Sequence, residues 1–429
     1  MEVKLGTEER FNFLKEFDPE IADLLRKEQI KQRETIGLIA SENVASPLST
    51  CLEGSIFTNK NTEGYPGKRY VSGTENEDKV ELIAIDRLKK LFGCGHANLQ
   101  SGNATIANSA VLMGLLQPGD TVLSMSLNDG GHLSHGAKFH FSGRFYNIIQ
   151  YGVRLEDEYI DMKMVRELAM EYKPKMIVCG ASAYPRLIDY AEFRRIANEV
   201  GAYLWVDAAH VIGLIAGKAI PSPVPYADVV TFSTQKTLRG PRGCGVILCK
   251  EELKNKIDRG VFPGMQGGPK ADMIAARAVL FKECMTTEYQ CYQQQVVKNA
   301  RALAQGCMDE GLKLVTGGTD THLALVRVTD FVESGREAEL LLESVGIVTN
   351  KNLVPFDTLN SNLTSGIRIG SPLMTTRGAK EGEMEHIGHL IGNTLKSKND
   401  KEKLNHIAEE VKKIAIRYPM FSDEWVVMN

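Results

Sequence analysis

An acid and an amine that each follow a short apolar run are the residues of this sequence best suited to chemistry. Asp207 ends the run AYLWVD, and Lys236 comes just after DVVTFST. In α/β proteins ligands gather at the carboxyl ends of strands, where such residues would lie. A lysine amine can form a Schiff base with pyridoxal phosphate, and a carboxylate can keep the pyridine nitrogen of that cofactor protonated. The pair fits a pyridoxal phosphate site. The alternative from spacing alone is structural, with Asp207 capping a helix and pairing with Lys236.

The elements that would position this pair are alternating strands and helices between residues 120 and 250. The runs expected to form strands are DTVLSMSL (120–127), KMIVCG (175–180), AYLWVDAAH (202–210), DVVTFST (228–234) and CGVILCK (244–250), with helices at 161–172 and 191–201. Strands that are apolar along their whole length indicate a parallel or mixed sheet with helices on both faces. The sequence therefore predicts an α/β architecture.

The region before this sheet is helical. Residues 1–35 are rich in charge, and Ile21, Leu24, Leu25 and Ile30 recur at helical spacing. They predict an N-terminal helical arm whose apolar face needs something to pack on.

A second helix is expected between residues 74 and 93. Thr74 to Glu77 has the T-x-x-E form of a capping box, and Gly93 stands where the helix should end.

The region after the sheet has a different pattern. A long helix around 286–310 is followed by HLALVRVT, a helix at 335–344, GIVTN, SGIRIGS and two terminal helices. This order is typical of a smaller α+β unit. We therefore expect a helical arm (1–35), a large α/β domain (36–285) and a C-terminal α+β domain (286–429).

The composition excludes several classes of partner. The 429 residues include 51 Lys and Arg and 54 Asp and Glu, a formal charge of -3, without a basic block suited to nucleic acid or lipid headgroups. No run approaches the roughly 18 apolar residues of a membrane span, and the charged N-terminus lacks the apolar stretch of a signal peptide. Eight cysteines without a CxxC pair predict buried, reduced thiols and a cytoplasmic location.

One histidine pair raises the question of a metal. His386 and His389 have i, i+3 spacing and would share a helical face. We interpret them as part of a solvated terminal helix and expect no metal site.

Eight longer words occur in order along nearly the whole chain. They are LIASEN (38–43), EGYPGKRY (63–70), GGHLSHG (130–136), GASAYPR (180–186), KTLRGPRG (236–243), VFPGMQGGP (261–269), GGTDTHL (317–323) and TSGIRIGSP (364–372). Together they resemble the serine hydroxymethyltransferase family, fold-type I pyridoxal phosphate enzymes that move a one-carbon unit between serine and glycine with tetrahydrofolate. The resemblance implies a large, mostly parallel sheet of the seven-stranded type and a smaller α+β domain.

The resemblance also implies cofactor roles at matching positions. Lys236 would form the Schiff base, Asp207 would hold the pyridinium nitrogen, and His132 would stack on the ring. Ser182 and His210 would lie near the phenolic oxygen. Without the match, a histidine after glycines such as His132 would be interpreted as a turn residue.

Other matching positions would hold the substrates. Arg368, with Ser41, would bind the amino acid carboxylate, because a guanidinium donates two parallel hydrogen bonds and so fixes the orientation of the α-carbon. The alternative is a surface ion pair, but an arginine in the apolar run SGIRIG would be costly without a buried anion. The family's folate contacts fall on Asn352, Leu127, Gly130, Gly131, Leu133 and Tyr70.

Two matches imply a homodimer with shared active sites, with a tetramer left open. Gly267 and Gly268 match a loop that reaches the cofactor phosphate of the neighbouring subunit, where missing side chains let backbone N–H groups approach the anion. Glu63, also expected from the neighbouring chain, would handle the proton of the substrate hydroxyl.

The chain departs from the family pattern around the cofactor. Gln235 stands where the family has a histidine, so a side chain that could gain a proton near neutral pH is lost. Asn61 and Val71 replace two tyrosines, one expected at the phosphate across the dimer and the other beside the substrate.

The expected phosphate segment is altered as well. It reads GNATIAN (102–108), which leaves Thr105 as the clear hydroxyl contact and Asn103 as a substitute. Asp272 occupies the place of a family histidine downstream of the glycine loop.

Three functions are compatible with these departures. The first is hydroxymethyl transfer or retro-aldol cleavage of a β-hydroxy amino acid, with space beside Val71 for a variant substrate such as α-methylserine. The second is a folate-independent aldolase or transaldolase of the threonine type, which the retained folate positions disfavour. The third is a weakly active cofactor-binding paralogue with a regulatory or binding role, which the retained lysine, aspartate, histidines and arginine disfavour.

Overall fold

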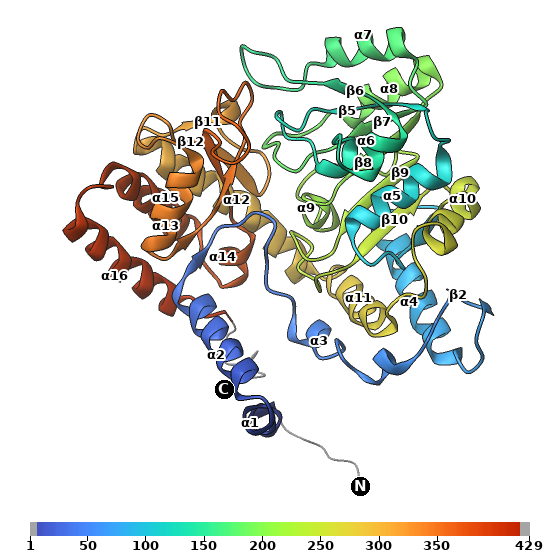
Figure 1. The fold of residues 1–429 in the computed structure, drawn as a ribbon, viewed down its shortest axis with the longest axis horizontal. Helices are drawn as coiled ribbons and strands as arrows, with labels where there is room; N and C mark the ends of the chain where they lie inside the picture. The colour runs from blue at the N-terminus through green and yellow to red at the C-terminus, as the bar shows by residue number, and fades with distance from the viewer. Residues whose placement is uncertain (1–6, 421–429) are drawn as a thin grey trace.

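The computed structural model describes residues 7–420, and its larger part is built on a mixed sheet of seven strands (Figure 1). The strands, in the order β4-β10-β9-β8-β7-β5-β6, are β4 (His96–Asn98), β10 (Gly245–Cys249), β9 (Val229–Ser233), β8 (Tyr203–Asp207), β7 (Met176–Cys179), β5 (Thr121–Met125) and β6 (Asn147–Tyr151). Strands β9 to β6 are parallel, and β10 is antiparallel to both β9 and β4. The predicted α/β fold is confirmed.

Apolar side chains cover both faces of this sheet. In β7, Ile177 and Cys179 belong to one core, whereas Met176 and Val178 belong to another, and all four are fully buried. Because strand side chains alternate between the two faces, a strand buried on both sides favours apolar residues at every position, and its few polar residues, such as Thr231 in β9, are buried too. This explains why the strand sequences are mostly apolar runs.

Helices complete each face. Helices α4 (Glu75–Phe92), α7 (Met162–Tyr172), α8 (Tyr190–Val200), α9 (Ile212–Ala216) and α11 (Ala271–Glu283) contribute to the core that contains Ile177. Helices α5 (Ala104–Leu115) and α10 (Lys254–Arg259) contribute to the core that contains Met176, and α6 (Phe141–Phe145) packs against it. The expected helices at 161–172 and 191–201 are α7 and α8.

The last third of the chain forms a second sheet with its own core. The antiparallel strands, in the order β11-β12-β15-β14, are β11 (Lys313–Leu314), β12 (Leu323–Arg327), β15 (Gly366–Gly370) and β14 (Asn350–Asn352). They are accompanied by α12 (Thr287–Asp309), α13 (Gly335–Ser344), α14 (Pro372–Thr376), α15 (Glu381–Lys396) and α16 (Lys401–Arg417). Helix α12 contacts both α15 and α9, so it joins the two sheets (Figure 1). The domain boundary near residue 285 stays a prediction.

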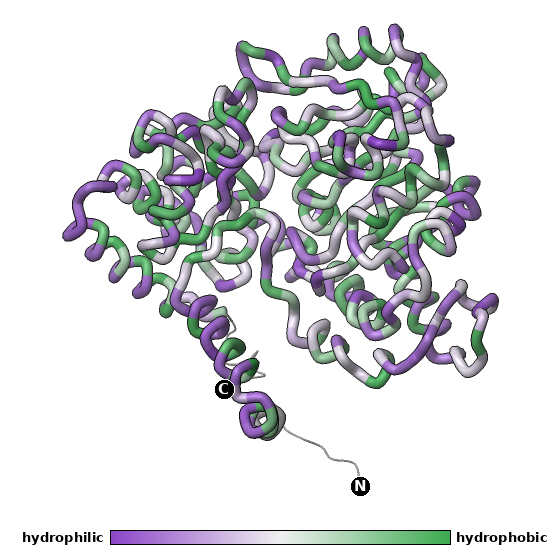
Figure 2. Tube along the Cα trace, in the orientation of Figure 1, coloured by the Kyte–Doolittle hydropathy of each residue, from purple (hydrophilic) through white to green (hydrophobic). Residues whose placement is uncertain are grey.

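The N-terminal arm consists of two helices, α1 (Thr7–Phe17) and α2 (Pro19–Glu34), and residues 1–6 lie outside the described part. After them, β1 (Ile36–Gly37) pairs with β13 (Ile347–Val348). The arm extends from the body, and its tube is mostly hydrophilic with interspersed apolar positions (Figures 1 and 2). Ile21, Leu24 and Ile30 are each about half exposed. The single chain therefore leaves the apolar face of the arm uncovered.

Three expectations about local structure were wrong. Helix α4 does begin after Thr74 and ends at Gly93, but the Thr74 side chain makes no capping hydrogen bond, because its backbone lacks the extended conformation of a capping residue. Cys51 and Cys291 are exposed, although the other six cysteines are buried and all eight are free thiols. The third concerns α15, the helix that carries His386 and His389.

Helix α15 is packed rather than solvated. Met384, Ile387 and Ile391 are fully buried in the core of the second sheet, because its apolar residues recur at helical spacing against α12. Its two histidines do not converge: His386 contacts Glu410 at 2.8 Å, whereas His389 contacts Glu310 at 2.9 Å. Within residues 7–420, no helix has the length and apolar character needed to span a bilayer.

Candidate active site

Lys236 and Asp207 lie at the carboxyl ends of neighbouring parallel strands. Asp207 is the last residue of β8, where it pairs in register with Thr231, and Lys236 follows the end of β9. The Lys236 amine donates to the Ser233 hydroxyl at 3.0 Å, and no ion pair joins it to Asp207 within the described residues. Burial lowers the pKa of Lys236 from 10.5 to about 8. The structural alternative, an ion pair of this lysine and this aspartate, is not formed.

The Asp207 carboxylate is instead held by three donors. Oδ2 accepts from Nδ2 of Asn108 at 2.8 Å and from His135 at 2.9 Å, and Oδ1 accepts from the backbone N–H of Ala209 at 3.0 Å. Burial raises the pKa of Asp207, but the hydrogen bonds from His135 and from the backbone N–H of Ala209 help to outweigh it, so the pKa lies below its usual 3.8. The site thus keeps a buried carboxylate ionised.

His135 is oriented by the chain that precedes it. Its Nδ1 accepts from the backbone N–H of His132 at 3.3 Å, so its proton is on Nε2 and points at Asp207. The nitrogens of His132 and His135 and the carboxylate oxygen lie close enough together for a metal. However, an Nε2–H directed at the carboxylate offers no lone pair there, so this cluster is better suited to holding Asp207.

Two neutral imidazoles surround the amine. Burial lowers the pKa of His132 to about 4, and its Nδ1 contacts the Ser134 hydroxyl at 2.7 Å. Burial, with the positive charges of Lys236 and Arg368, lowers the pKa of His210 well below 6.5. Neither ring therefore adds positive charge around Lys236 at neutral pH.

Arg368 is a buried cation without a carboxylate partner in the described part of the chain. It stands in the middle of β15, is 8% exposed, and donates from Nη1 to the backbone oxygen of Ser182 at 2.8 Å and from Nε to Oδ1 of Asn350 at 3.3 Å. Burial lowers its pKa from 12.5 to about 10. A surface ion pair is excluded, and the guanidinium remains available for a buried anion.

Glycines let the neighbouring loop approach closely. A side chain at Gly131 would place Cβ 2.3 Å from the backbone oxygen of Met125, and Gly130 has φ of +113° with Ala183 oxygen 2.8 Å from the same point. The backbone N–H of Ser182 donates to the oxygen of Gly130 at 2.8 Å. The segment that carries His132 is thereby packed against the segment that carries Ser182.

Within the described part of the chain, three buried polar atoms lack partners in or just before α5 and beside Lys236 in the sequence. Asn103 caps this helix, with Oδ1 accepting from the N–H of Ile106 at 2.9 Å, and Thr105 follows in the first turn. Three buried side-chain atoms, Oγ of Ser101, Oδ1 of Asn108 and Oε1 of Gln235, have no hydrogen-bond partner among residues 7–420. Buried polar atoms normally make hydrogen bonds, so we expect a polar ligand or a water molecule to bind at these atoms.

Four predicted residues lie together in a separate group. A side chain at Gly267 would place Cβ 3.3 Å from Oε1 of Glu63, and one at Gly268 would place it 3.0 Å from Cγ of Glu63. Tyr70 is 72% exposed and packs edge-on against Phe262. No hydrogen bond or ion pair links Glu63 to Lys236, Asp207 or Arg368 in the described part of the chain. The loop of Gly267 and Gly268 does contact the segment before α5, because the N–H of Gly102 donates to Oε1 of Gln266 at 3.0 Å.

The hairpin that carries Glu63 and Tyr70 is anchored by buried charge. It consists of β2 (Gly64–Tyr65) and β3 (Lys68–Arg69). Arg69 donates to Glu81 at 2.6 Å and to Asp78 at 2.8 Å. Such paired, buried charges fix a short hairpin in one position.

The remaining predicted positions lie at the edges of the site. Asn352 ends β14, and its Nδ2 donates to the backbone oxygen of Leu353. Ser41 and Leu127 are half-buried, whereas Leu133 is 42% exposed. Asn43, two residues after Ser41, donates to the backbone oxygen of Lys236 at 3.1 Å, so the LIASEN segment does contact the lysine loop.

The positions that depart from the family pattern differ in their surroundings. Asn61 is exposed, and its Oδ1 accepts from the N–H of Glu63 at 3.1 Å. Val71 is half-buried at the end of the same hairpin. Asp272 is buried in the first turn of α11 and accepts from the N–H of Gly54 at 3.2 Å, so it serves the α3 (Pro47–Thr50) region.

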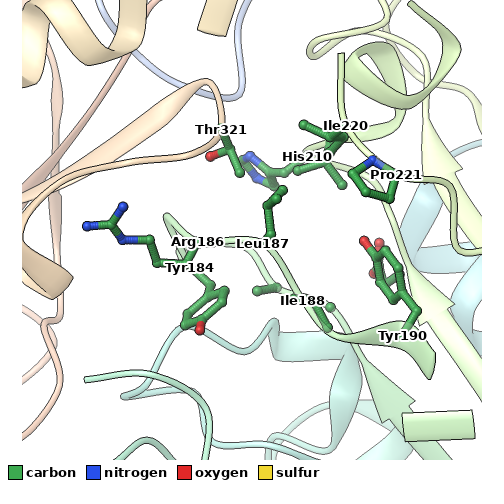
Figure 3. Close-up of a pocket in the computed structure, with 13 residues that line it drawn as sticks. Tyr184, Arg186, Leu187, Ile188, Tyr190, His210, Ile220, Pro221 and Thr321 are labelled. Carbon is green, nitrogen blue, oxygen red and sulfur yellow. The ribbon is translucent and has the colours of Figure 1, made fainter. Parts of the chain in front are cut away.

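A small cleft is lined by Asp207 and His210, among other residues. Figure 3 shows His210 in it. His210 and Thr321 lie beside each other on one side of it, and Tyr184 and Tyr190 lie on the other sides. The Thr321 hydroxyl is buried and has no partner within the described residues.

Sequence reasoning missed four residues of this site. His135, which holds Asp207, and His322, which contacts His210, occur in words that carry the family resemblance, and their place there was the available signal. Asn108, which also holds Asp207, and Ser101 lie outside those words.

A buried lysine beside a buried, ionised aspartate, at adjacent strand ends of a mostly parallel seven-stranded sheet, defines the class of fold-type I pyridoxal phosphate enzymes. Residues 14–391 match the family model described as serine hydroxymethyltransferase. A serine hydroxymethyltransferase of Coprothermobacter proteolyticus is 51% identical over 412 residues, which cover 96% of this chain and 99% of that protein. The chain belongs to the serine hydroxymethyltransferase family, as the resemblance implied, and is a pyridoxal phosphate-dependent hydroxymethyltransferase with tetrahydrofolate as co-substrate.

The residues present fit this cofactor. Asp207 supplies a buried anion for a pyridinium nitrogen, Lys236 supplies an amine of lowered pKa, and the unpartnered atoms of Ser101, Asn108 and Gln235 leave room for polar groups of a ligand. We expect Asp207 and Lys236 to contact opposite ends of the bound ring.

The lowered pKa of Lys236 predicts how cofactor uptake depends on pH. Only the neutral amine attacks an aldehyde, and with a pKa of about 8 its fraction rises about tenfold between about pH 7 and about pH 9 and then levels off. The rate at which cofactor-free protein takes up pyridoxal phosphate is followed by absorbance. It should rise with pH and reach half of its maximum at the pKa of Lys236. N-acetyl-lysine amide serves as the control amine, and a rate that rises without a plateau through pH 10 in both samples would contradict the burial of Lys236.

Proposed function

We propose that this protein converts serine to glycine, and the reverse, at the Lys236 site, with the amino acid carboxylate bound by Arg368. The observation that carries the proposal is the buried guanidinium of Arg368, which has no carboxylate partner within residues 7–420 and lies near enough to lower the pKa of Lys236. A carboxylate is the natural anion for such a planar, two-pronged donor.

Each side chain has a distinct task in this proposal. Pyridoxal phosphate, when bound, supplies a ring that accepts electrons from the α-carbon of the substrate. Lys236 binds the cofactor and releases it to the incoming amino group, while Asp207 keeps the ring nitrogen protonated. Arg368, with Ser41, fixes the carboxylate, and so decides which bond at the α-carbon is aligned with the ring.

Histidines and the α5 region complete the cofactor contacts in the proposal. His132 would stack on the ring, and Ser182 and His210 would lie near its phenolic oxygen. Asn103, Thr105 and Gln235 serve the phosphate. Asn103 would use its amide nitrogen, because its oxygen already caps α5.

A second copy of the chain completes the site in this proposal. Glu63, Gly267 and Gly268 lie together but are not linked to the Lys236 group of their own chain, which supports a role in the neighbouring subunit. The exposed apolar residues of α2 offer a surface that a homodimer would cover. Glu63 of that second copy would take up the proton of the substrate hydroxyl. Assembly into a tetramer and a cytoplasmic location stay predictions.

Folate would bind at the rim of the site. Leu133 is exposed and Leu127 is half-buried, so apolar surface is open to a flat ring there, and the exposed Tyr70 of a second copy would add to it. Gly130, Gly131 and Asn352 complete the positions expected to contact it.

The test of this function is the conversion of serine by the purified protein. Glycine should accumulate from serine with tetrahydrofolate and should fall to a small residual rate without it. Equal rates with and without tetrahydrofolate would favour the aldolase alternative. No glycine in either condition, in a sample whose visible absorption shows bound cofactor, would favour the weakly active paralogue.

Val71 predicts a wider choice of substrate. Valine replaces a tyrosine beside the substrate, so a methyl group on the α-carbon has room that the family tyrosine would fill. A misplaced methyl group in a pocket costs about 1 to 3 kcal/mol, or about 10- to 200-fold. We expect Val71→Tyr to lower kcat/KM for α-methylserine relative to serine by about tenfold or more.

Leu340→Tyr, at an exposed position of α13, is the matched control and should leave the ratio unchanged. The measurement is kcat/KM of each variant for serine, for α-methylserine and, as a third substrate, for threonine. An unchanged preference in Val71→Tyr would mean that Val71 does not face the α-carbon.

A further inference from the structure

The turn that carries Lys236 is held in place by side chains from distant parts of the chain. The backbone oxygen of Lys236 accepts from Nδ2 of Asn43 at 3.1 Å. The backbone oxygens of the next two residues accept from Nε2 of Gln293 at 2.7 Å and from the hydroxyl of Tyr289 at 3.1 Å. Three successive carbonyl groups are therefore bonded to other segments, and the turn cannot shift without breaking these bonds.

The turn needs such support because one of its residues has a strained backbone. Arg239 has φ of +66°, in the left-handed region that residues other than glycine rarely adopt. Its N–H donates to the backbone oxygen of Lys236 at 3.1 Å, so the strained residue closes the turn on the lysine itself. A backbone of this kind persists only where neighbouring contacts fix it, and it occurs often at functional sites.

Two of the three donors form one unit on α12. Tyr289 and Gln293 are four residues apart and so share a face of the helix, and Nε2 of Gln293 also donates to the Tyr289 hydroxyl at 2.9 Å. Gln293 is fully buried and Tyr289 is 4% exposed. Burial raises the pKa of Tyr289 well above 10, so its hydroxyl keeps the proton that it donates to the turn.

The same helix is bonded to the end of the strand that bears Arg368. Arg368 stands in the middle of β15, and Ser371 directly follows that strand. The Ser371 hydroxyl donates to the backbone oxygen of Val296 on α12 at 2.7 Å. Helix α12 thus links the Lys236 turn to the strand that carries the guanidinium.

We propose that Tyr289 and Gln293 are positioning residues, which hold the Lys236 turn so that the lysine amine stays in its buried site. The proposal deepens the proposed function, on which it rests for the role of Lys236. Both side chains act through backbone carbonyl groups, and neither is expected to touch cofactor or substrate. Loss of either donor should let the turn move and let water reach the amine.

The position of the amine can be followed through its titration. Burial lowers the pKa of Lys236 to about 8, and water at the amine would raise it towards 10.5. The titratable groups that interact with this amine are Asp207, Arg368, Arg242, His132 and His210. None of these groups stands on α12, so a neutral replacement on that helix adds or removes no charge beside the amine.

The experiment measures, across a range of pH, the rate at which cofactor-free, full-length protein takes up pyridoxal phosphate. Gln293→Met fills the same space without an N–H group, and the pH of half-maximal rate should rise from about 8 by about one unit or more. Because the neutral fraction of an amine falls about tenfold for each such unit, uptake at about pH 7 should be about tenfold slower. Tyr289→Phe removes the other donor and should shift the midpoint in the same direction.

Asn299→Leu is the matched control. Asn299 is also fully buried on α12, and its Nδ2 donates to Oγ1 of Thr375 and to the backbone oxygen of Ala379, both at 2.8 Å. This variant should keep the wild-type midpoint. An unchanged midpoint in Gln293→Met, or an equal shift in Asn299→Leu, overturns the proposal. If Gln293→Met does not fold, an unchanged midpoint in Tyr289→Phe overturns it instead.

Reduction of the same samples with borohydride, followed by mass spectrometry, separates this inference from the proposed function. An adduct on Lys236 together with an unchanged midpoint refutes only the role of Tyr289 and Gln293. An adduct confined to another lysine refutes the proposed function, and this inference with it.

Discussion

Replacing Lys236 with methionine is expected to lower kcat for serine cleavage by at least about 1,000-fold, which corresponds to about 4 kcal/mol of barrier. Methionine keeps the length and apolar character of the side chain, so the buried space around it stays filled. The change removes the amine that, in the proposed function, binds the cofactor and releases it to the amino group of the substrate. The rate of glycine formation and the visible absorption of the bound cofactor measure the effect.

Lys163→Met is the matched control, because Lys163 is an exposed residue of α7. It should keep wild-type activity and absorption. A Lys236→Met protein that still forms glycine at a rate within tenfold of the wild type would show that another amine performs this step.

Replacing Arg368 with lysine is expected to raise KM for serine by about 100-fold or more. The arginine would donate two hydrogen bonds to the carboxylate, each worth about 1.5 to 3 kcal/mol when charged groups are involved, and the single lysine ammonium cannot reproduce their parallel geometry. Loss of the orientation at the α-carbon should lower kcat as well. The measurement is steady-state kinetics with serine as the varied substrate.

Arg336→Lys, at an exposed position of α13, is the control and should leave KM unchanged. Cofactor absorption in Arg368→Lys should resemble that of the wild type, because the proposed cofactor contacts are made by other side chains and lysine keeps the positive charge. A KM for serine within threefold of the wild-type value would show that the carboxylate binds to another group.

The large sheet could be predicted because its sequence obeys a simple rule. Strands buried on both faces favour apolar residues at every position, and so AYLWVD and DVVTFST were recognisable as strands, with Asp207 and Lys236 just at or beyond their ends. The neighbouring positions of β8 and β9 then brought the two residues together.

Features set by tertiary packing could not be predicted in this way. The solvated character expected for α15 was wrong. The helix carries polar residues, but its other residues are buried by packing that the helix's own sequence does not reveal. The exposure of Cys51 and Cys291 depends on which side of a helix or turn faces the body, and residue type does not reveal this. The Thr74 side chain makes no capping hydrogen bond because of the φ and ψ angles of that residue, and residue type does not determine these angles.

The candidate site, like the fold, could be predicted only in part. Spacing alone left Lys236 and Asp207 open to a structural interpretation, and only the longer words indicated a family. Asn108 and His135 escaped because they act on Asp207 and not on a ligand, and His322 escaped because its contact with His210 crosses between two sheets. Contacts made by residues far apart in the chain have no local pattern.

The most direct test of the central claim is to locate the cofactor on the chain. The protein loaded with pyridoxal phosphate is reduced with borohydride, digested with trypsin and analysed by mass spectrometry. The account predicts a cofactor adduct at Lys236, in the peptide that ends at Arg239. An adduct confined to another lysine, or none in a protein that forms glycine from serine, would contradict it.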